Sequence, residues 1–103
     1  MGNNKKEITI KGTKYTLDFF NEKRGYVGQN DSGEKVISIQ ANQTKYELQK
    51  TIYHELLHGY FHECGLPAFA DNEYLITFLE ETLYEILDNL SIATELYKKE
   101  YKI

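Results

Sequence analysis

The stretch T-I-Y-H-E-L-L-H-G-Y-F-H-E-C-G, residues 51–65, decides how this chain folds and contains its most informative side chains. Within it, His54, Glu55 and His58 form the pattern H-E-x-x-H. Four residues of an α-helix advance about 6 Å and slightly more than one turn, so both histidines project from one face. Two imidazoles at this spacing can share one divalent metal ion. The glutamate lies about 100° around the helix, where it can take a proton from a water molecule at the metal.

The residues around this motif predict a helix from about 44 to 63. Thr44 and Glu47 fit a capping box, which satisfies backbone N–H groups of the first helical turn. Gly65 and Pro67 are stop signals. An apolar stripe of helical period lies between these ends, at Leu48, Ile52 and Leu56. Spacing, helix and glutamate agree, so we favour a metal site over an amphipathic core helix whose histidines are incidental.

The residues before the motif helix predict a small β-sheet. Alternating apolar and polar residues indicate two strands that pair as a hairpin, then a short extended piece and a further strand, at 7–11, 14–20, 25–28 and 35–40. The segment Q-N-D-S-G-E, residues 29–34, has the composition of a turn.

The residues after the motif helix predict a loop at 66–71 and a second helix from about 72 to 89 or beyond. Asp71 or Asn72 is the expected cap. The tail to Tyr101 is expected to be helical, either continuous or after a break near 89–91. One face of this helix collects the apolar side chains Leu75, Ile76, Leu79, Leu83, Ile86, Leu87 and Leu90.

A catalytic zinc ion needs a third protein ligand besides the two histidines. His62 continues the i, i+4 series but lies about 12 Å from His54 along a straight helix, too far for one ion. Cys64 could join only if the helix end unwinds. We therefore predict Glu80, on the flank of the second helix's apolar stripe, with Glu81 as the alternative. Ordinary solvated carboxylates remain the other interpretation of both.

Length and composition indicate one folded α+β domain over residues 1–103, with residues 1–6 frayed. Hydrophobic residues make up 41% of the chain, which supports a small core. The net charge of −4 argues against a nucleic-acid or anionic membrane partner. A single cysteine excludes an internal disulfide and fits a cytoplasmic setting. No apolar run is long enough to span a membrane, no secretory signal is recognised, and the oligomeric state stays open.

The chain resembles small zinc-dependent proteins of phages and mobile elements, related to the ImmA/IrrE-type zincin-like metallopeptidases. The resemblance lies in K-V-I-S-I, T-I-Y-H-E-L-L-H-G, E-C-G-L and N-E-Y-L-I-T-F-L-E-E-T-L-Y-E-I-L. It implies a zincin-like minimal core: an antiparallel or mixed sheet of three to four strands, then two or three helices, with the motif helix packed on the sheet. It also implies Zn²⁺ held by His54 and His58, with Glu55 as the catalytic residue. The family's third ligand, a glutamate early in the second helix, aligns with Thr77, one turn before Glu80 and Glu81.

The resemblance implies a zinc metallo-endopeptidase that acts on a protein or peptide substrate, with regulatory proteins such as repressors as the expected class. The departure at Thr77 favours an alternative, a catalytically weak or inactive binding module that keeps the scaffold. A third hypothesis is a structural domain with an incidental histidine pair. Candidate hydrogen-bond donors to the reacting carbonyl, by residue type, are Tyr53, Tyr60 and Tyr84.

Overall fold

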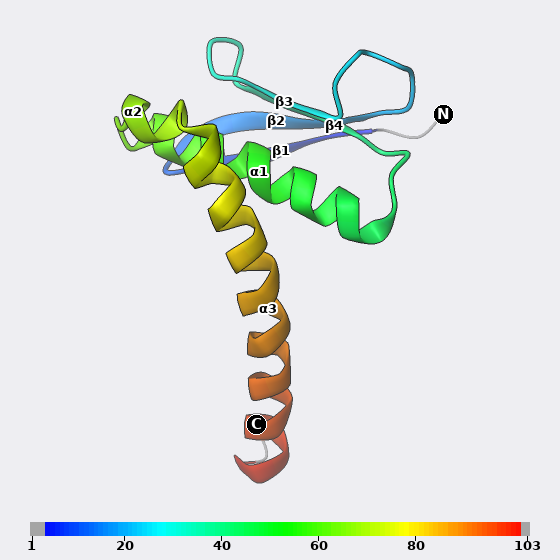
Figure 1. Ribbon diagram of the computed structural model, residues 1–103, viewed down its shortest axis with the longest axis vertical. Helices are drawn as coiled ribbons and strands as arrows, with labels where there is room; N and C mark the ends of the chain where they lie inside the picture. The colour runs from blue at the N-terminus through cyan, green and yellow to red at the C-terminus, as the bar shows by residue number, and fades with distance from the viewer. Residues whose placement is uncertain (1–3, 102–103) are drawn as a thin grey trace.

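A mixed sheet of four strands comes first in the chain, and helices follow it (Figure 1). The computed structural model describes residues 4–101. Its elements are β1 (Lys5–Ile10), β2 (Thr13–Phe20), β3 (Gly28–Asp31), β4 (Val36–Gln40), α1 (Lys45–Glu63), α2 (Pro67–Ala70) and α3 (Glu73–Tyr101). This architecture confirms the predicted α+β class, with a small sheet followed by helices.

The strand order in the sheet is β1-β2-β4-β3. β1 and β2 form the predicted antiparallel hairpin, β2 and β4 run parallel, and β3 pairs antiparallel with β4. The connection from β2 to β4 therefore passes through β3, which lies at one edge of the sheet. This edge strand borders a cleft beside α1.

Two boundaries in the sheet differ from the sequence-based prediction. Lys5 and Lys6 are paired with Asp18 and Leu17 in β1, so the predicted frayed segment is wrong there, while residues 1–3 lie outside the described part. The third strand covers residues 28–31 instead of 25–28, and the turn moves to 32–35. Polar residues that favour a turn locally are held extended by their pairing with β4, a tertiary effect that composition does not contain.

The core lies between the sheet and α1. Ile10, Tyr15, Ile37 and Ile39 are buried, and the predicted stripe of Leu48, Ile52 and Leu56 packs against them. A β-carbon at Gly59 would lie 3.0 Å from Cδ1 of Ile10, so the glycine allows the helix to approach the strands closely. Thr44 caps α1 as predicted, its Oγ1 accepting a hydrogen bond from the Glu47 N–H at 3.2 Å.

α3 is one continuous helix of 29 residues, without the break considered near 89–91. Asn72 caps it by accepting a hydrogen bond from the Leu75 N–H at 3.0 Å. Ile76 is fully buried, but every residue from 85 to 101 is exposed, so the expected core face ends after Leu83. The second half of α3 extends away from the sheet and α1 (Figure 1).

None of the helices described between residues 4 and 101 has the length and apolar character needed to cross a membrane.

The end of α1 is attached to the sheet through the carboxylate of Glu63. It accepts hydrogen bonds from the hydroxyls of Thr13 (2.9 Å) and Tyr15 (2.7 Å) and from Lys35 Nζ (2.8 Å). The bonds from Lys35, Tyr15 and Thr13 lower the pKa of Glu63 from 4.5 to about 2. Burial, together with the neighbouring Glu63 carboxylate, raises the pKa of Tyr15, whose hydroxyl stays protonated as a donor.

We expect this attachment to stabilise the fold above pH 5 and to lose its effect as the pH falls through 4.5 toward 2. A lowered carboxylate pKa contributes stability that disappears as the folded state takes up the proton. The difference in free energy of unfolding between wild type and Glu63→Gln should therefore be largest near pH 7 and shrink below pH 5. Urea unfolding from pH 2.5 to 7 measures it. The exposed Glu95→Gln serves as control, and a pH-independent difference for Glu63→Gln would contradict the prediction.

Candidate metal centre

Two histidines from α1 and one glutamate from α3 meet at a single point. The Nε2 atoms of His54 and His58 are 3.2 Å apart. The carboxylate of Glu73, in the first turn of α3, lies 2.7 Å from Nε2 of His58 and 3.1 Å from Nε2 of His54. One ligand atom from each residue lies within 4.8 Å of the others, as a shared metal ion requires. α1 supplies the histidine pair through its i, i+4 spacing, and the short connection through α2 brings the start of α3 to it.

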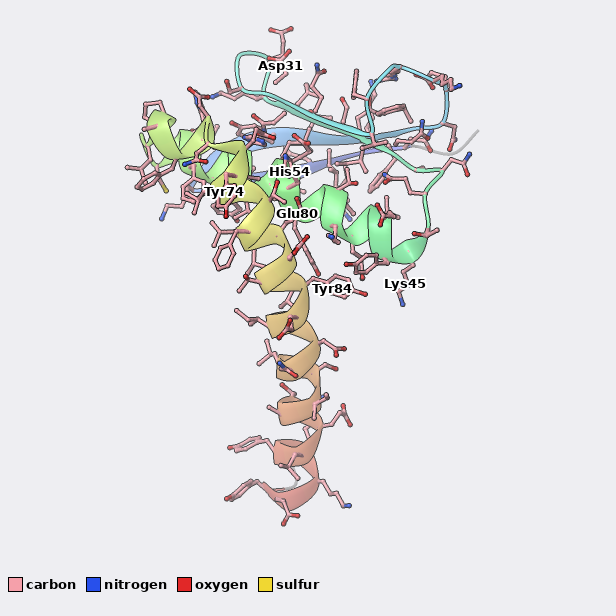
Figure 2. The ribbon with its side chains drawn as sticks, viewed as in Figure 1. Asp31, Lys45, His54, Tyr74, Glu80 and Tyr84 are labelled. Atoms are coloured by element: carbon pink, nitrogen blue, oxygen red, sulfur yellow. The ribbon has the colours of Figure 1, made fainter. Side chains whose placement is uncertain are left out.

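The other ring nitrogen of each histidine is already engaged. Nδ1 of His54 is 2.7 Å from Oε1 of Glu80, and Nδ1 of His58 is 2.7 Å from the carbonyl oxygen of Ala70 (Figure 2 shows His54 and Glu80). A carbonyl oxygen and an ionised carboxylate only accept hydrogen bonds, so each Nδ1 carries the proton of its neutral ring. Each Nε2 then presents a lone pair to the meeting point, the orientation that outer hydrogen bonds impose on metal-binding histidines.

This arrangement fits a divalent cation. With both rings neutral, two nitrogen lone pairs and a carboxylate face one another without a hydrogen between them, and either a proton on one Nε2 or a metal cation among the three groups relieves the repulsion. A tetrahedral zinc site with metal–ligand distances of about 2.0–2.1 Å has edges of about 3.3–3.4 Å. The Nε2 atoms of His54 and His58 are 3.2 Å apart, close to that size, and one or the other oxygen of Glu73 lies within 3.1 Å of each. Three protein ligands would leave a fourth position open, as catalytic zinc sites do.

The local charge also favours a cation. Burial lowers the pKa of His54, but its hydrogen bond to Glu80 and the negative charges of Glu55, Glu73 and Glu80 outweigh burial and raise the pKa above its ordinary value. Three carboxylates thus surround two imidazoles at the contact between α1 and α3. A divalent ion would offset this excess of negative charge.

Glu55 lies beside the histidine pair, against the edge strand. Its side chain is buried, and burial raises the pKa of its carboxyl group, while charge on His54 and His58 opposes the rise. A β-carbon added at Gly28 would lie 2.8 Å from Oε2 of Glu55 and 2.7 Å from Cγ2 of Thr51. Gly28 in β3 therefore leaves the space that the Glu55 carboxylate occupies, and a larger residue there would push it away.

A cleft of about 660 Å³ opens over these residues. Its walls come from β3 and the segment before it, from α1 and from the start of α3, and include Tyr26, Gly28, Asn30, Glu55 and Glu73.

The hydrogen bonds of β3 determine which of its main-chain groups are free. The carbonyl oxygen of Val27 accepts a hydrogen bond from the Gln40 N–H at 2.8 Å, so these two residues form a hydrogen-bonded pair. Because hydrogen-bonded and non-hydrogen-bonded pairs alternate along an antiparallel ladder, the main-chain N–H and C=O groups of Gly28 and Asn30 point away from β4, toward the free edge of the sheet.

The sequence-based choice of the third acidic residue differs from this geometry. Glu80 is buried and approaches the Nδ1 side of His54, opposite the point where the Nε2 atoms meet. Glu81 is exposed and lies 3.4 Å from Lys50 Nζ on α1. Thr77, at the aligned family position, is exposed. Among the described residues, the acid that joins both histidines is Glu73, so we revise the assignment from Glu80 or Glu81 to Glu73.

The remaining candidates lie outside the group of three. His62 and Cys64 are exposed, and only His62 borders the cleft. The rings of Tyr53 and Tyr84 contact each other with centroids 6.4 Å apart. Neither they nor Tyr60 line the cleft, whose tyrosine is Tyr26.

Sequence reasoning missed Glu73, the Ala70 carbonyl and Gly28. A signal for Glu73 was present, because Glu73 and Glu80 are seven residues apart and lie on one face of a helix. Both acids can therefore reach the same histidine, one on each nitrogen. The Ala70 carbonyl depends on α2, in a segment predicted to be a loop.

No family model, curated protein or solved structure matches this chain.

Proposed function

We propose that this protein is a zinc-dependent metallo-endopeptidase that holds Zn²⁺ through His54, His58 and Glu73. The observation that carries the proposal is the convergence of two Nε2 lone pairs and one carboxylate, with both Nδ1 atoms committed to other acceptors. The resemblance of the motif segments to ImmA/IrrE-type proteins agrees with it and remains a prediction. A cytoplasmic setting also belongs to the proposal, since the exposed Cys64 is the only cysteine.

The residues around the histidines divide the chemistry among them. Zinc bound here would supply a Lewis acid that polarises a carbonyl group and makes water more acidic. Glu55 accepts the proton of the attacking water and returns it to the leaving amide nitrogen. Its carboxylate is mostly buried beside Gly28 and borders the cleft in which the attacking water would lie. Glu80 and the Ala70 carbonyl hold the two imidazole rings in place.

The substrate that fits this site is an extended segment of a protein. Main-chain N–H and C=O groups of Gly28 and Asn30 are directed to the open edge beside the cleft, where an added strand can pair with them. Peptide main chain supplies matching donors and acceptors whatever its side chains. A regulatory protein as the substrate rests on the resemblance alone.

We expect the purified protein to contain about one zinc ion per chain and to cleave members of a mixed peptide library. Chelation should remove both the metal and the cleavage, and added zinc should restore both. Metal analysis and mass spectrometry of the library before and after each step measure this. A protein that neither contains nor takes up a divalent metal would contradict the proposal. Metal binding without cleavage would favour the binding module, for which the departure at Thr77 is the supporting observation.

A further inference from the structure

The exposed half of α3 carries an apolar stripe that continues the buried one. Its members alternate at spacings of three and four residues: Ile76, Leu79, Leu83, Ile86, Leu90, Ala93 and Tyr97. The first three pack in the body of the protein or at its margin, whereas Ile86, Leu90 and Tyr97 are 52%, 56% and 50% exposed. A 3-4 spacing sustained over three heptads is the pattern of helices that pair in a coiled coil.

Residues 85–101 form a helix about 25 Å long in which every residue is exposed (Figure 2). The segment continues the packed first half of α3 and needs no new nucleation, but its own apolar face lacks the tertiary packing that gives protein helices most of their stability. The glycine and proline that end α1 have no equivalent here, since this segment contains neither residue. A packed neighbour is what a helix with this stripe needs.

We propose that the neighbour is α3 of a second copy, in antiparallel orientation. Residues 80–90 contain four acids and no base, whereas residues 91–101 contain two acids and two lysines. Parallel pairing would place the acidic halves of both copies side by side, while antiparallel pairing sets each against a neutral half. The dipoles of two neighbouring helices also attract each other when the helices are antiparallel. The arrangement is self-complementary, as a two-fold dimer requires.

Side-chain sizes agree with the same orientation. An antiparallel pairing centred between residues 91 and 92 sets Leu90 of each copy against Ala93 of the other, and Ile86 against Tyr97. Large and small side chains then alternate across the interface, which keeps the packing even. In a parallel pairing, Ala93 would face Ala93 and leave a gap.

The exposed area is sufficient for an interface of this kind. Tyr97 and Tyr101 are 50% and 69% exposed, which at about 150–250 Å² for a whole aromatic side chain leaves roughly 200–250 Å² between them. Ile86, Leu87 and Leu90 add a similar area. Two copies thus offer roughly 800–1,000 Å² of apolar surface before the flanking residues are included, close to the lower limit of about 1,000 Å² for a specific interface.

Sedimentation equilibrium of the full chain tests the pairing. The wild type should be a dimer, and Leu90→Glu should raise the dissociation constant at least about 100-fold, because it places a charge inside an apolar contact. Ile92→Glu is the matched control, since Ile92 is 63% exposed but lies on the opposite side of the helix. It should stay dimeric. Circular dichroism and zinc content verify that both variants fold.

A cysteine variant tests the orientation. In a Cys64→Ser background, Tyr97→Cys should not form a disulfide between copies, because antiparallel pairing separates the two positions by eleven residues, about 16 Å. Ile86→Cys combined with Tyr97→Cys should crosslink. A monomeric wild type, or equal weakening by Leu90→Glu and Ile92→Glu, would overturn the dimer. Efficient crosslinking of Tyr97→Cys alone would overturn its orientation, and neither result touches the metal site.

Discussion

Replacing Glu55 with glutamine is expected to abolish peptide cleavage and leave zinc bound. Glutamine has nearly the same size as glutamate, so it fits the space beside Gly28 and Thr51, which is too small for a larger residue. It cannot accept the proton of the attacking water. Removing a positioned general base costs about 10²–10⁴ in rate, so cleavage should fall by at least about 100-fold.

The comparison needs an acid outside the site as its control. Glu81→Gln removes an exposed carboxylate that contacts Lys50, and it should retain both zinc and cleavage. Cleavage rates of the library members cut by wild type, normalised to zinc content, give the measurement. A Glu55→Gln protein that cleaves within a few-fold of wild type would exclude Glu55 as the base. Loss of zinc in this variant would instead show that Glu55 helps to hold the metal.

The motif helix was predictable because its signals are local. Thr44 at the start, Gly65 at the end and an apolar stripe between them set the helix within one residue at each boundary. The i, i+4 spacing then dictates that His54 and His58 share a face. The same holds for the hairpin of β1 and β2 and for Asn72 as a cap. In each case, the residues that decide the structure are neighbours in the sequence.

β3 was misplaced because its conformation is decided elsewhere. Gln29, Asn30 and Asp31 favour a turn by their own chemistry, yet they form a strand by pairing with β4. The exposure of α3 beyond Leu83 is a similar case. An apolar stripe predicts that one face of a helix is buried, but it does not indicate whether the residues that pack on it belong to the same chain.

The sequence-based choice of the third acid differs from the geometry because the rotation of α3 about its own axis is a tertiary property. Taking the apolar stripe as the face toward the core correctly placed Glu80 at the contact with α1. It did not show on which side of the imidazole Glu80 would arrive. The side of the ring that each acid reaches depends on where α3 begins. The connection through α2 places Glu73, which lies two turns before Glu80 in α3, at the Nε2 atoms.

Zinc affinity should distinguish the role of Glu73, the proposed metal ligand, from that of Glu80, a hydrogen-bond partner of His54, when each acid is replaced. Glu73→Ala removes a carboxylate from the meeting point of both Nε2 atoms and should weaken zinc binding by more than about 100-fold. Glu80→Ala removes only the partner of His54 Nδ1, and loss of such an outer partner costs about 10–100-fold. Glu80→Gln should cost less than Glu80→Ala, because the amide oxygen can still accept the Nδ1 hydrogen bond.

Competition with a chromophoric chelator measures these affinities, and Glu81→Ala should match wild type. The order matters more than any single value, since an outer residue and a ligand can both weaken binding. If Glu80→Ala abolished zinc binding while Glu73→Ala retained it, the assignment made from the sequence would stand, and α3 would have to rotate when the metal binds. If Glu73→Ala has the larger effect, the ion lies where the two imidazoles and the first turn of α3 meet. Glu80 then affects zinc binding only indirectly, by holding the His54 ring through Nδ1, because the same carboxylate cannot also reach the metal at Nε2 of that ring.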